Sequence, residues 1–375
     1  MPTYRPPTLI TPIALALSAI AAIASPAWSQ SRSSHYLSDV QGTVEVGRYL
    51  ITPDRAFNGL LVSNGHQIRV DTNSRVTLNC SNGSRHTFTS SDTYRVADYC
   101  PREASRRSGA INNPTRDPFN PTLPYLISPR NTVLLTAEEM ILQWHPVEGA
   151  MTYTVSLQGP GVDWTTTVSE TAVILPETVT FRPNYTYSVI VSADTGLSSA
   201  GDLPVQFAVL PVAEAERVQS QVAAIQAQTL EPDVEAIALA LAYLEFEHSD
   251  PDWDSYALNQ AALDVVEARI EAGTENPQIY LLQGEAYQIM SLPLLAQAGF
   301  QQALTLAEAA NQQELQAQSH VGLANVAIRQ TAYGEAMSHL QAAQELYKTL
   351  GDTESVAALQ VRIDEIDAQR PNASS

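Results

Sequence analysis

Residues 279–309, IYLLQGEAYQIMSLPLLAQAGFQQALTLAEA, decide the fold of the larger part of this chain. Apolar residues recur there every three or four positions, which is typical of amphipathic helices. The break at Ser291-Leu292-Pro293 divides the stretch in two, because proline is tolerated at the start of a helix but not in its interior. Gly284 and Ala296 are small and Phe300 is large, so two antiparallel helices can pack closely around one bulky side chain. The stretch therefore predicts a pair of tightly packed helices.

The same arrangement of small and large residues returns further along the chain. The second unit repeats the order Gly284, Ala296, Phe300, Ala303 as Ala324, Ala336, Leu340 and Ala343. A third, weaker unit precedes both and ends with Ala261, Val265 and Ala268. These positions resemble tetratricopeptide repeats (TPR), which carry small, tyrosine-like and then Ala-x-x-x-large-x-x-Ala positions. The resemblance implies helix pairs stacked side by side in an array. An unrelated antiparallel helical bundle is the alternative.

Residues 212–370 as a whole are rich in alanine, leucine and glutamine and poor in glycine and proline. We expect about eight helices in this region. The predicted breaks lie at Glu231-Pro232, Ser249-Asp250-Pro251, Gly273-Thr274, Ser291-Leu292-Pro293, Asn311, Thr331 and Gly351-Asp352. A short repeat array needs capping helices, and the first and last helical segments, 211–229 and 354–369, are the candidates.

The TPR resemblance also implies where a partner binds, because in that family the first helix of each repeat lines a concave groove. The positions of this chain that match are Gln278, Leu281, Glu285, Gln288, Ile289, Gln318, Val321, Asn325, Ile328 and Arg329. They are mostly amides and aliphatic residues, and the whole chain holds one lysine, Lys348. A groove that clamps a carboxylate terminus uses basic residues, so we expect an apolar or basic helix or an extended peptide instead.

Residues 36–100 predict a small antiparallel β domain. Val44 and Val46 alternate with polar residues, and three Asn-Gly pairs, at 58–59, 64–65 and 82–83, mark hairpin turns. The pieces Gly59-Leu60-Leu61, Gly65-His66-Gln67-Ile68 and Ser74-Arg75-Val76-Thr77-Leu78 are similar to FecR-type domains.

The chain has two cysteines, Cys80 and Cys100. In an exported protein they are expected to form a disulfide, and two separate buried thiols are the alternative.

Prolines are frequent in residues 101–130, which predicts a linker, and strand patterns return in residues 131–211. The stretches from Trp144 to Val155 and from Phe181 to Val191 resemble the B–C and F regions of fibronectin type III modules, an Ig-like β-sandwich. The resemblance makes Trp144 the core tryptophan. It makes Tyr187 the corner tyrosine, whose hydroxyl returns to the backbone upstream.

The N-terminus predicts export. An apolar run from Leu9 to Ala24 is followed by small residues, and Ala27 and Ser29 fit cleavage after Ser29. Residues 1–29 are therefore expected to be a signal peptide, and a retained membrane anchor is the alternative. No later run is long enough to span a bilayer. The mature protein is expected in the periplasm, in the cell envelope or outside the cell, without an integral membrane segment.

The charge distribution and the motifs limit the function. Residues 212–375 hold 6 basic and 24 acidic residues, a net charge of −18, which disfavours nucleic acid as a partner. No catalytic motif, metal-ligand spacing or cofactor fingerprint occurs in the sequence. The sequence thus predicts a multidomain, non-enzymatic scaffold that binds a protein partner. The alternative is a cell-envelope protein that binds polysaccharide or peptidoglycan through an exposed aromatic strip on the N-terminal β domain.

Overall fold

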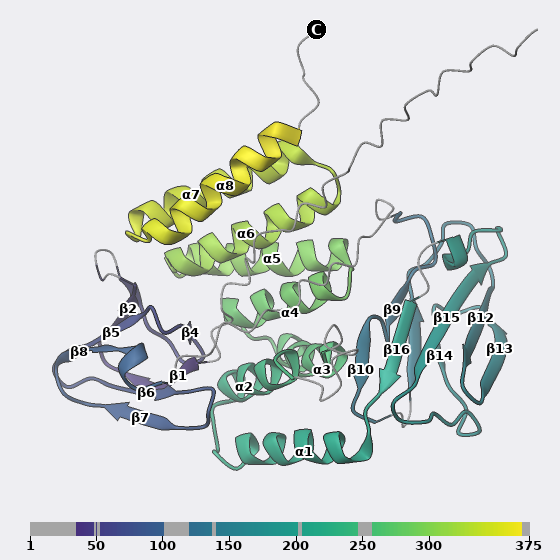
Figure 1. Cartoon of the computed structure of the whole chain (residues 1–375), viewed down its shortest axis with the longest axis horizontal. Coiled ribbons are helices and arrows are strands. Elements are labelled where there is room, and N and C mark those ends of the chain that lie inside the picture. The colour runs from purple at the N-terminus through teal and green to yellow at the C-terminus, as the bar shows by residue number, and fades with distance from the viewer. Residues whose placement is uncertain are drawn as a thin grey trace, which may run out of the picture.

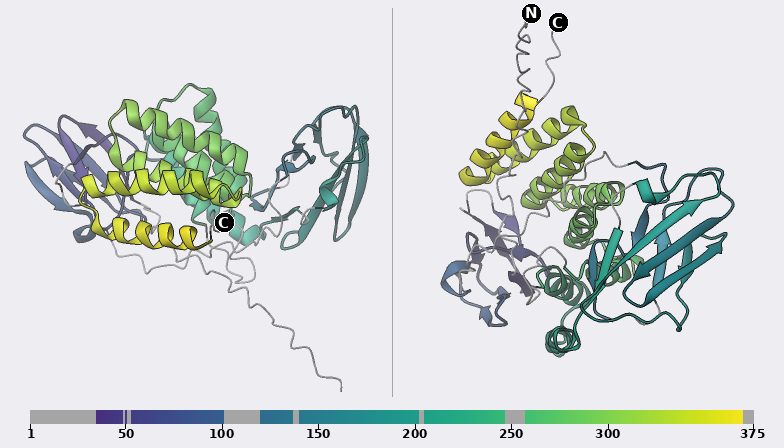
Figure 2. Two further views of the ribbon diagram at one scale, coloured as in Figure 1. Left: turned by 90° about the horizontal axis from the view of Figure 1, so that it is seen from above. Right: turned by 45° about the vertical axis from the view of Figure 1, so that its right-hand side comes forward.

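The computed structural model describes residues 35–48, 50, 53–100, 120–136, 140–201, 205–246 and 257–369. The helices form the middle of the molecule, with a small β domain on one flank and a β-sandwich on the other (Figure 1). Figure 2 shows the same order from two further directions. The predicted signal peptide, 1–29, lies outside the described residues, as does 101–119 of the predicted linker.

The N-terminal β domain consists of two antiparallel four-stranded sheets, because its apolar residues alternate and face each other. Leu37, Val46, Ile68 and Leu78 point into the core and are 3% exposed or less. The first sheet has the order β4 (Leu61–Val62), β1 (His35–Gln41), β6 (Arg75–Asn79), β7 (Arg85–Phe88). The second has the order β3 (Asp54–Arg55), β2 (Val44–Gly47), β5 (Gln67–Val70), β8 (Asp92–Arg95), and a 3₁₀ turn, η1 (Val96–Asp98), follows it.

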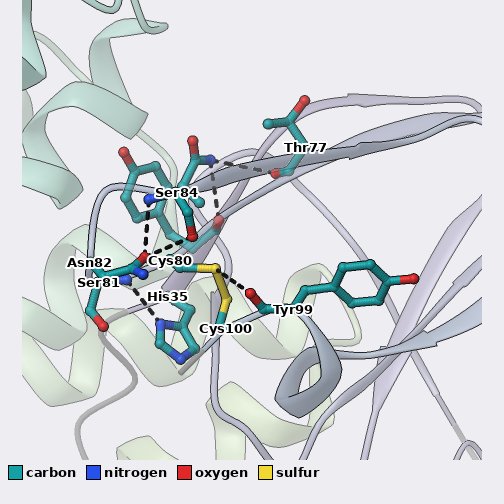
Figure 3. Close-up of a disulfide and its surroundings, with 10 residues drawn as sticks. His35, Thr77, Cys80, Ser81, Asn82, Ser84, Tyr99 and Cys100 are labelled. Carbon is teal, nitrogen blue, oxygen red and sulfur yellow. Dashed lines mark hydrogen bonds between the residues drawn. A yellow bond between two sulfur atoms is a disulfide. The ribbon is translucent and has the colours of Figure 1, made fainter. Parts of the chain in front are cut away.

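The predicted disulfide between Cys80 and Cys100 is present, and Figure 3 shows its surroundings. It ties the end of β6 to the residue that closes the domain, and both cysteines are buried. Beside it, the Ser81 N–H donates to His35 Nδ1 at 3.1 Å. The disulfide therefore links the last residues of the domain to its core.

The β-sandwich has a five-stranded sheet and a three-stranded sheet with a shared core. The first sheet has the order β10 (Thr132–Leu134), β16 (Val205–Val209), β15 (Thr186–Ala193), β12 (Tyr153–Gly159), β13 (Val162–Val168), and β10 pairs with β16 in parallel. The second has the order β14 (Ala172–Ile174), β11 (Ile141–Trp144), β9 (Leu126–Ser128). Trp144 lies in the core at 1% exposure, and Tyr187 Oη accepts the Arg182 N–H at 2.7 Å. The upstream backbone contact expected for Tyr187 is thus present.

The sandwich begins earlier than the sequence predicted. Strand β9 and the buried Tyr125, Leu126 and Arg130 lie inside 101–130, which was expected to be linker. Proline excludes a backbone N–H only at its own position. A three-residue strand therefore fits between Pro124 and Pro129.

Eight helices follow in the described part of the chain, as the breaks in the sequence predicted. They are α1 (Val212–Gln226), α2 (Pro232–Leu244), α3 (Asn259–Glu271), α4 (Pro277–Ile289), α5 (Pro293–Ala309), α6 (Gln313–Arg329), α7 (Tyr333–Thr349) and α8 (Thr353–Gln369). Each of α3 to α7 ends two residues before a residue with positive φ, a common way to stop a helix. These residues are Gly273, Ser291, Asn311, Thr331 and Gly351.

The main contacts of the helices join neighbours in the sequence, from α1–α2 through α7–α8. In addition α2 contacts α4, and α4 contacts α6. Alternate helices therefore share a layer, which we call the A-helix layer and define as α2, α4, α6 and α8. This is an extended stack of helix pairs (Figure 1).

Small residues bring the helices of this stack together, as predicted. A Cβ added at Gly299 would lie 2.9 Å from the backbone nitrogen of Gly284, and Phe300 fills the space beside Gly284 and Gly322. In α3 the register differs in part from the prediction: Ala261 and Val265 are half-buried and pack against the core, Ala268 is exposed, and the next residues, Ala262 and Val266, are fully buried. Alanine and valine occur as adjacent pairs on α3, at 261–262 and 265–266, so the sequence alone did not decide which residue of each pair faces the core.

Helix length and hydropathy bear on membrane insertion. Among the described residues, no helix combines the length and the apolar character that crossing a bilayer requires.

Candidate protein-interaction surface

The ten predicted groove residues all lie on α4 and α6, in the A-helix layer, and none of them is fully exposed. Gln278 and Leu281, near the start of α4, are 1% and 3% exposed. Leu281 belongs to an apolar cluster that continues into the core of the N-terminal β domain. The expectation that these two residues line an open groove was therefore wrong, because the β domain of the same chain packs on this end of the layer.

The other eight residues are half-buried, and several have partners within the chain. Ile289 packs against the cluster under α2 and α3, and Val321 and Ile328 pack against the cluster of α6, α7 and α8. Gln318 hydrogen-bonds Glu314. Glu285 and Gln288 are also half-buried, and among the described residues no partner bonds the amide oxygen of Gln288. The surface is thus a mixture of apolar and amide groups.

Two arginines belong to this surface: Arg329, which is one of the ten predicted residues, and Arg362 of α8, which was not predicted. Arg329 donates to the Ser291 hydroxyl at 3.3 Å, and Arg362 of α8 donates to Asn325. Burial lowers the pKa of both guanidinium groups. Arg362 was missed because α8 was interpreted as a capping helix and not as part of the groove. The second half of the A-helix layer therefore offers guanidinium groups as well as amides.

The N-terminal β domain contacts the start of every helix in the A-helix layer. The residues that directly precede these helices are Glu231, Asn276, Gln312 and Asp352. Each of them meets a residue of the segment between Arg48 and Asn58. The residues of the β domain contact the helices in reverse chain order: Arg48 contacts α8, Asp54 and Arg55 contact α6, and Asn58 contacts α4 and α2. Four described residues of the β domain, Arg48, Asp54, Arg55 and Asn58, thus contact the row of helix starts.

Asp54 caps α6 from outside the helix. Its carboxylate accepts the N–H of Gln313 at 3.0 Å and that of Glu314 at 2.8 Å, while the Gln312 side chain donates to the Arg55 carbonyl at 2.9 Å. The first N–H groups of a helix have no partner inside it, and a carboxylate there also interacts favourably with the helix dipole. Burial raises the pKa of Asp54, and the two N–H donors partly offset this rise.

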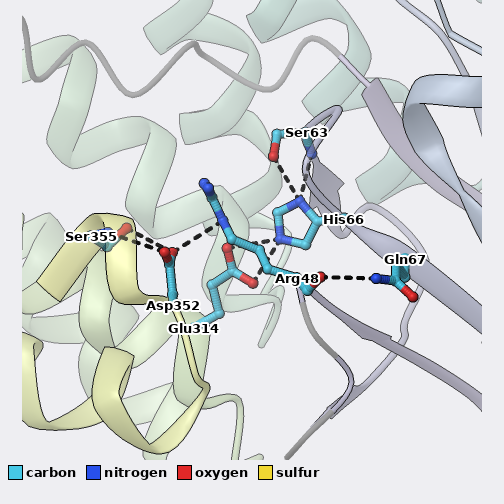
Figure 4. Close-up of polar contacts among 7 residues, drawn as sticks. All are labelled: Arg48, Ser63, His66, Gln67, Glu314, Asp352 and Ser355. Atoms are coloured by element: carbon cyan, nitrogen blue, oxygen red, sulfur yellow. Dashed lines mark hydrogen bonds and ion pairs between the residues drawn. The ribbon is translucent and has the colours of Figure 1, made fainter.

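A buried polar cluster lies beside this cap (Figure 4). The Ser63 N–H donates to His66 Nδ1 at 2.8 Å, so the ring proton lies on Nε2 and is donated to the Glu314 carboxylate at 2.8 and 2.9 Å. Burial raises the pKa of Glu314, but His66 and Arg48 lower it by more, so this carboxyl titrates below its usual range. The cluster therefore keeps a carboxylate ionised between the β domain and α6.

Arg48 extends the same cluster to α8. Its Nε lies 3.2 Å from Asp352, whose carboxylate also accepts the Ser355 N–H at 3.1 Å and the Ser355 hydroxyl at 2.7 Å (Figure 4). Asp352 thus caps α8 and pairs with the β domain through the same side chain.

Asn58 forms hydrogen bonds at the starts of the first two helices of the layer, α2 and α4. The side-chain amide of Asn58 donates to Glu231 at 2.7 Å, and the backbone carbonyl of Asn58 accepts from the Asn276 side chain at 3.4 Å. The next residue, Gly59, has φ +88°, and a Cβ there would lie 2.5 Å from Ile237 of α2. Position 59 therefore favours glycine for two reasons, its positive φ and its close approach to α2.

The β-sandwich contacts the opposite side of the stack. Arg130 and Asn131 donate to the Met290 carbonyl at the end of α4, at 2.9 and 3.4 Å. The Thr132 hydroxyl accepts the N–H of Gln260 at the start of α3, at 3.1 Å. Side chains from both β units therefore satisfy helix ends that the helices do not satisfy themselves.

The remaining chemistry of the described residues is sparse. No three His, Cys, Asp or Glu side chains in the described ranges converge as a metal site would require. On the β domain, Tyr36 and Phe88 are buried, Phe57 and Tyr94 are half-buried, and Tyr99 is 36% exposed. The stack of Phe88 on Tyr94 joins β7 to β8 across the two sheets. The described aromatic residues therefore do not form the exposed strip that polysaccharide binding predicts.

Sequence reasoning did not identify Arg48, Asp54, Asn58 or His66 as contact residues. Gln312 is a poor N-cap residue, whereas Asn276 and Asp352 are good ones. Leu292 and Ala332, which precede α5 and α7, are also poor N-cap residues, so a poor cap does not by itself indicate that another element supplies one.

Comparison with known proteins adds no further assignment. No protein-family model matches this chain, and a search of curated proteins finds no match either.

Proposed function

We propose that this chain is an exported, non-enzymatic scaffold whose helices form a tetratricopeptide-type repeat that binds a segment of another protein. The observation that carries the proposal is the A-helix layer itself. Its helices are spaced by glycine and alanine contacts, and its second half carries Gln318, Asn325 and Arg329, half-buried, together with Arg362. Such a row of amides and guanidinium groups suits the backbone and side chains of an extended segment.

Export is supported by the Cys80–Cys100 disulfide, since such bonds persist in oxidising compartments. We infer that the partner is a protein of the periplasm, of the cell envelope or of the cell exterior. The sandwich, which we assign to the fibronectin type III type, and the FecR-like β domain hold the repeat from both flanks.

Site-specific photo-crosslinking in the full chain tests this function. A photoreactive residue at Gln318 or Asn325 of α6 is expected to capture one protein species from envelope extract. The same residue at Gln301, which is exposed on α5 outside the A-helix layer, is the matched control and is expected to capture none. Equal capture from both helices would contradict the proposal. Capture only from Tyr99 would favour binding through the β domain.

A further inference from the structure

Strand β13 is the longest strand at the edge of a sheet in the described part of the chain. It has seven residues, Val162–Val168, and ends the five-stranded sheet of the sandwich on the side away from the helices (Figure 1). The other edge strands are short: β3 and β4 have two residues, β9, β10 and β14 have three, and β7 and β8 have four. Proteins commonly keep edge strands short, because an open edge pairs with other strands.

Strand β13 also lacks the other features that block an edge. Its sequence, VDWTTTV, contains no proline and no lysine, and Asp163 is its one charged residue. Its pairing with β12 runs without a bulge over all seven residues. Lysine, proline and bulges are the usual means of preventing edge-to-edge pairing. The strand therefore has the properties of an edge that accepts a further strand.

The register fixes which backbone groups of β13 point outward. The Asp194 N–H donates to the Thr152 carbonyl at 3.0 Å, and successive residues of a strand bond to opposite sides. Even-numbered residues of β12 therefore bond β15, and odd-numbered residues of β12 bond the even-numbered residues of β13 with which they pair. The N–H and C=O groups of the odd-numbered residues Asp163, Thr165 and Thr167 consequently point away from β12, toward the open edge.

We propose that two copies of this chain pair antiparallel through β13, about a two-fold axis at Thr165. In this register Thr165 lies opposite its own copy and Asp163 lies opposite Thr167, so the outward groups match and form about six hydrogen bonds. Trp164 lies opposite Thr166, and an aromatic residue beside a β-branched one is a favourable cross-strand pair. The strand is thus complementary to itself, and no like charges face each other across the axis.

Charge complementarity also favours a second copy as the occupant. The net charge of the chain, −20, opposes self-association in general. Beyond the strand, however, the same register brings the exposed Glu170 of one copy to the Pro160-Gly161 turn of the other. Arg182 lies against that turn, with its Nε 3.5 Å from the position of a Cβ on Gly161. By symmetry the pair of Glu170 and Arg182 occurs twice in the dimer.

The dimer goes beyond the proposed function and does not depend on it. Since β13 lies on the side of the sandwich away from the helices, pairing leaves the A-helix layer of each copy uncovered (Figure 1). Two helical stacks in one assembly raise the avidity for any partner that carries two binding segments.

Cysteine cross-linking in the full chain tests the register. Both native cysteines are in the Cys80–Cys100 disulfide, so an introduced cysteine is a free thiol. Thr165→Cys places the Cα atoms of the two copies about 5.5 Å apart, within the range of a disulfide. Thr167→Cys is the matched control, because this residue is exposed on the same strand but its two copies lie about 13 Å apart along the strands.

Mild oxidation is expected to link the Thr165→Cys chains about tenfold faster than the Thr167→Cys chains, since pairing raises the effective concentration of one thiol at the other. A mixture of Asp163→Cys and Thr167→Cys chains is expected to give mainly the mixed dimer. Equal rates at positions 165 and 167 would overturn the inference.

Sedimentation velocity of the full chain measures the association without an introduced thiol. Wild type is expected to show a reversible monomer–dimer equilibrium between micromolar and sub-millimolar concentration. Thr165→Lys places two like charges on the axis and is expected to leave only monomer. Thr87→Lys adds the same charge at an exposed position of the edge strand β7 and is expected to keep the wild-type equilibrium.

Circular dichroism checks that Thr165→Lys is folded, and Thr165→Glu replaces it if it is not. A wild-type chain that stays monomeric over the whole concentration range would overturn the inference. A dimer that persists in the folded Thr165 variant would overturn it as well.

Discussion

The carboxylate of Asp54 accepts the backbone N–H of Glu314 at 2.8 Å, although 260 positions separate the two residues in the sequence. A strand of the β domain thus completes the first turn of a helix in the helical stack. The same relationship recurs with Thr132 of the sandwich and Gln260 of α3. Caps supplied from outside make the helical stack depend on its two β flanks.

The ion pair of Arg48 and Asp352 is expected to couple the β domain to α8. Asp352 is nearly enclosed, so the variants Arg48→Gln and Asp352→Asn should show a coupling of about 1 kcal/mol in a double-mutant cycle of unfolding free energies. Asparagine still accepts the Ser355 N–H, so the cap of α8 is kept. The exposed pair of Arg95 and Asp98 is the control, with an expected coupling near zero. A similar value for both pairs would argue against the contact.

Close packing of α4 on α5 is expected to exclude a side chain at Gly299. Alanine there would meet the Gly284 backbone at 2.9 Å, so Gly299→Ala should lower the free energy of unfolding by about 1–3 kcal/mol, despite the better helix propensity of alanine. Gly334 of α7 has nothing within 4 Å of an added Cβ, so Gly334→Ala should raise stability by up to about 1 kcal/mol. Urea denaturation compares the two, and equal effects would show that the helices are not in close contact.

The disulfide is expected to stabilise the β domain by restricting its unfolded chain. Cys80 and Cys100 are 20 positions apart, for which loop closure predicts about 3 kcal/mol. The double variant Cys80→Ser, Cys100→Ser should lose this amount in denaturant titration, and a reducing agent should destabilise wild type but not the variant. Peptide mapping without reductant should recover the linked pair. Recovery of two free thiols from native protein would contradict the assignment.

The histidine pair between α6 and α7 is expected to make the stability of the helical stack sensitive to acid. His320 Nδ1 lies 3.0 Å from His339 Nδ1. Burial and the neighbouring ring lower the pKa of His320 to about 4, and burial lowers the pKa of His339, which Glu335 partly offsets. A lowered histidine pKa means that the folded state favours the neutral ring. The protein therefore has its full stability above the pKa of the unfolded histidine, near 6.5, and loses stability as the pH falls from there toward about 4.

The variant His320→Gln, His339→Gln should therefore lose less unfolding free energy than wild type between pH 7 and pH 4.5. His86→Gln, on the β domain, is the control and should keep the wild-type slope. Identical slopes for all three proteins would rule out a contribution from the pair.

The helical region was the most predictable part of the chain, because its breaks are local. Gly273, Ser291, Asn311, Thr331 and Gly351 were all predicted break points, and each has positive φ after a helix. The disulfide followed from cysteine count and the expected compartment. The upstream backbone contact of Tyr187 followed from a local motif, since its partner Arg182 is five residues away.

The docking of the three units was not predictable from the sequence. Gln278 and Leu281 were expected to be open to a partner, but both are buried, and Leu281 lies in an apolar cluster that it shares with the β domain. Nothing local in Asp54 or Asn58 distinguishes a cap for a distant helix from an ordinary turn residue. The poor cap residue Gln312 is not a sign either, because α5 and α7 follow the equally poor N-cap residues Leu292 and Ala332.

Hydrogen exchange of the Gln313 and Glu314 amides in the full chain tests the central claim, that the β domain caps the helix starts of the A-helix layer. These two N–H groups have no partner within α6, so only the docked Asp54 can protect them. The account predicts slow exchange in wild type, fast exchange in Asp54→Ala, and no change in Asp92→Ala, an exposed position of the same domain. Fast exchange of both amides in wild-type protein would contradict it.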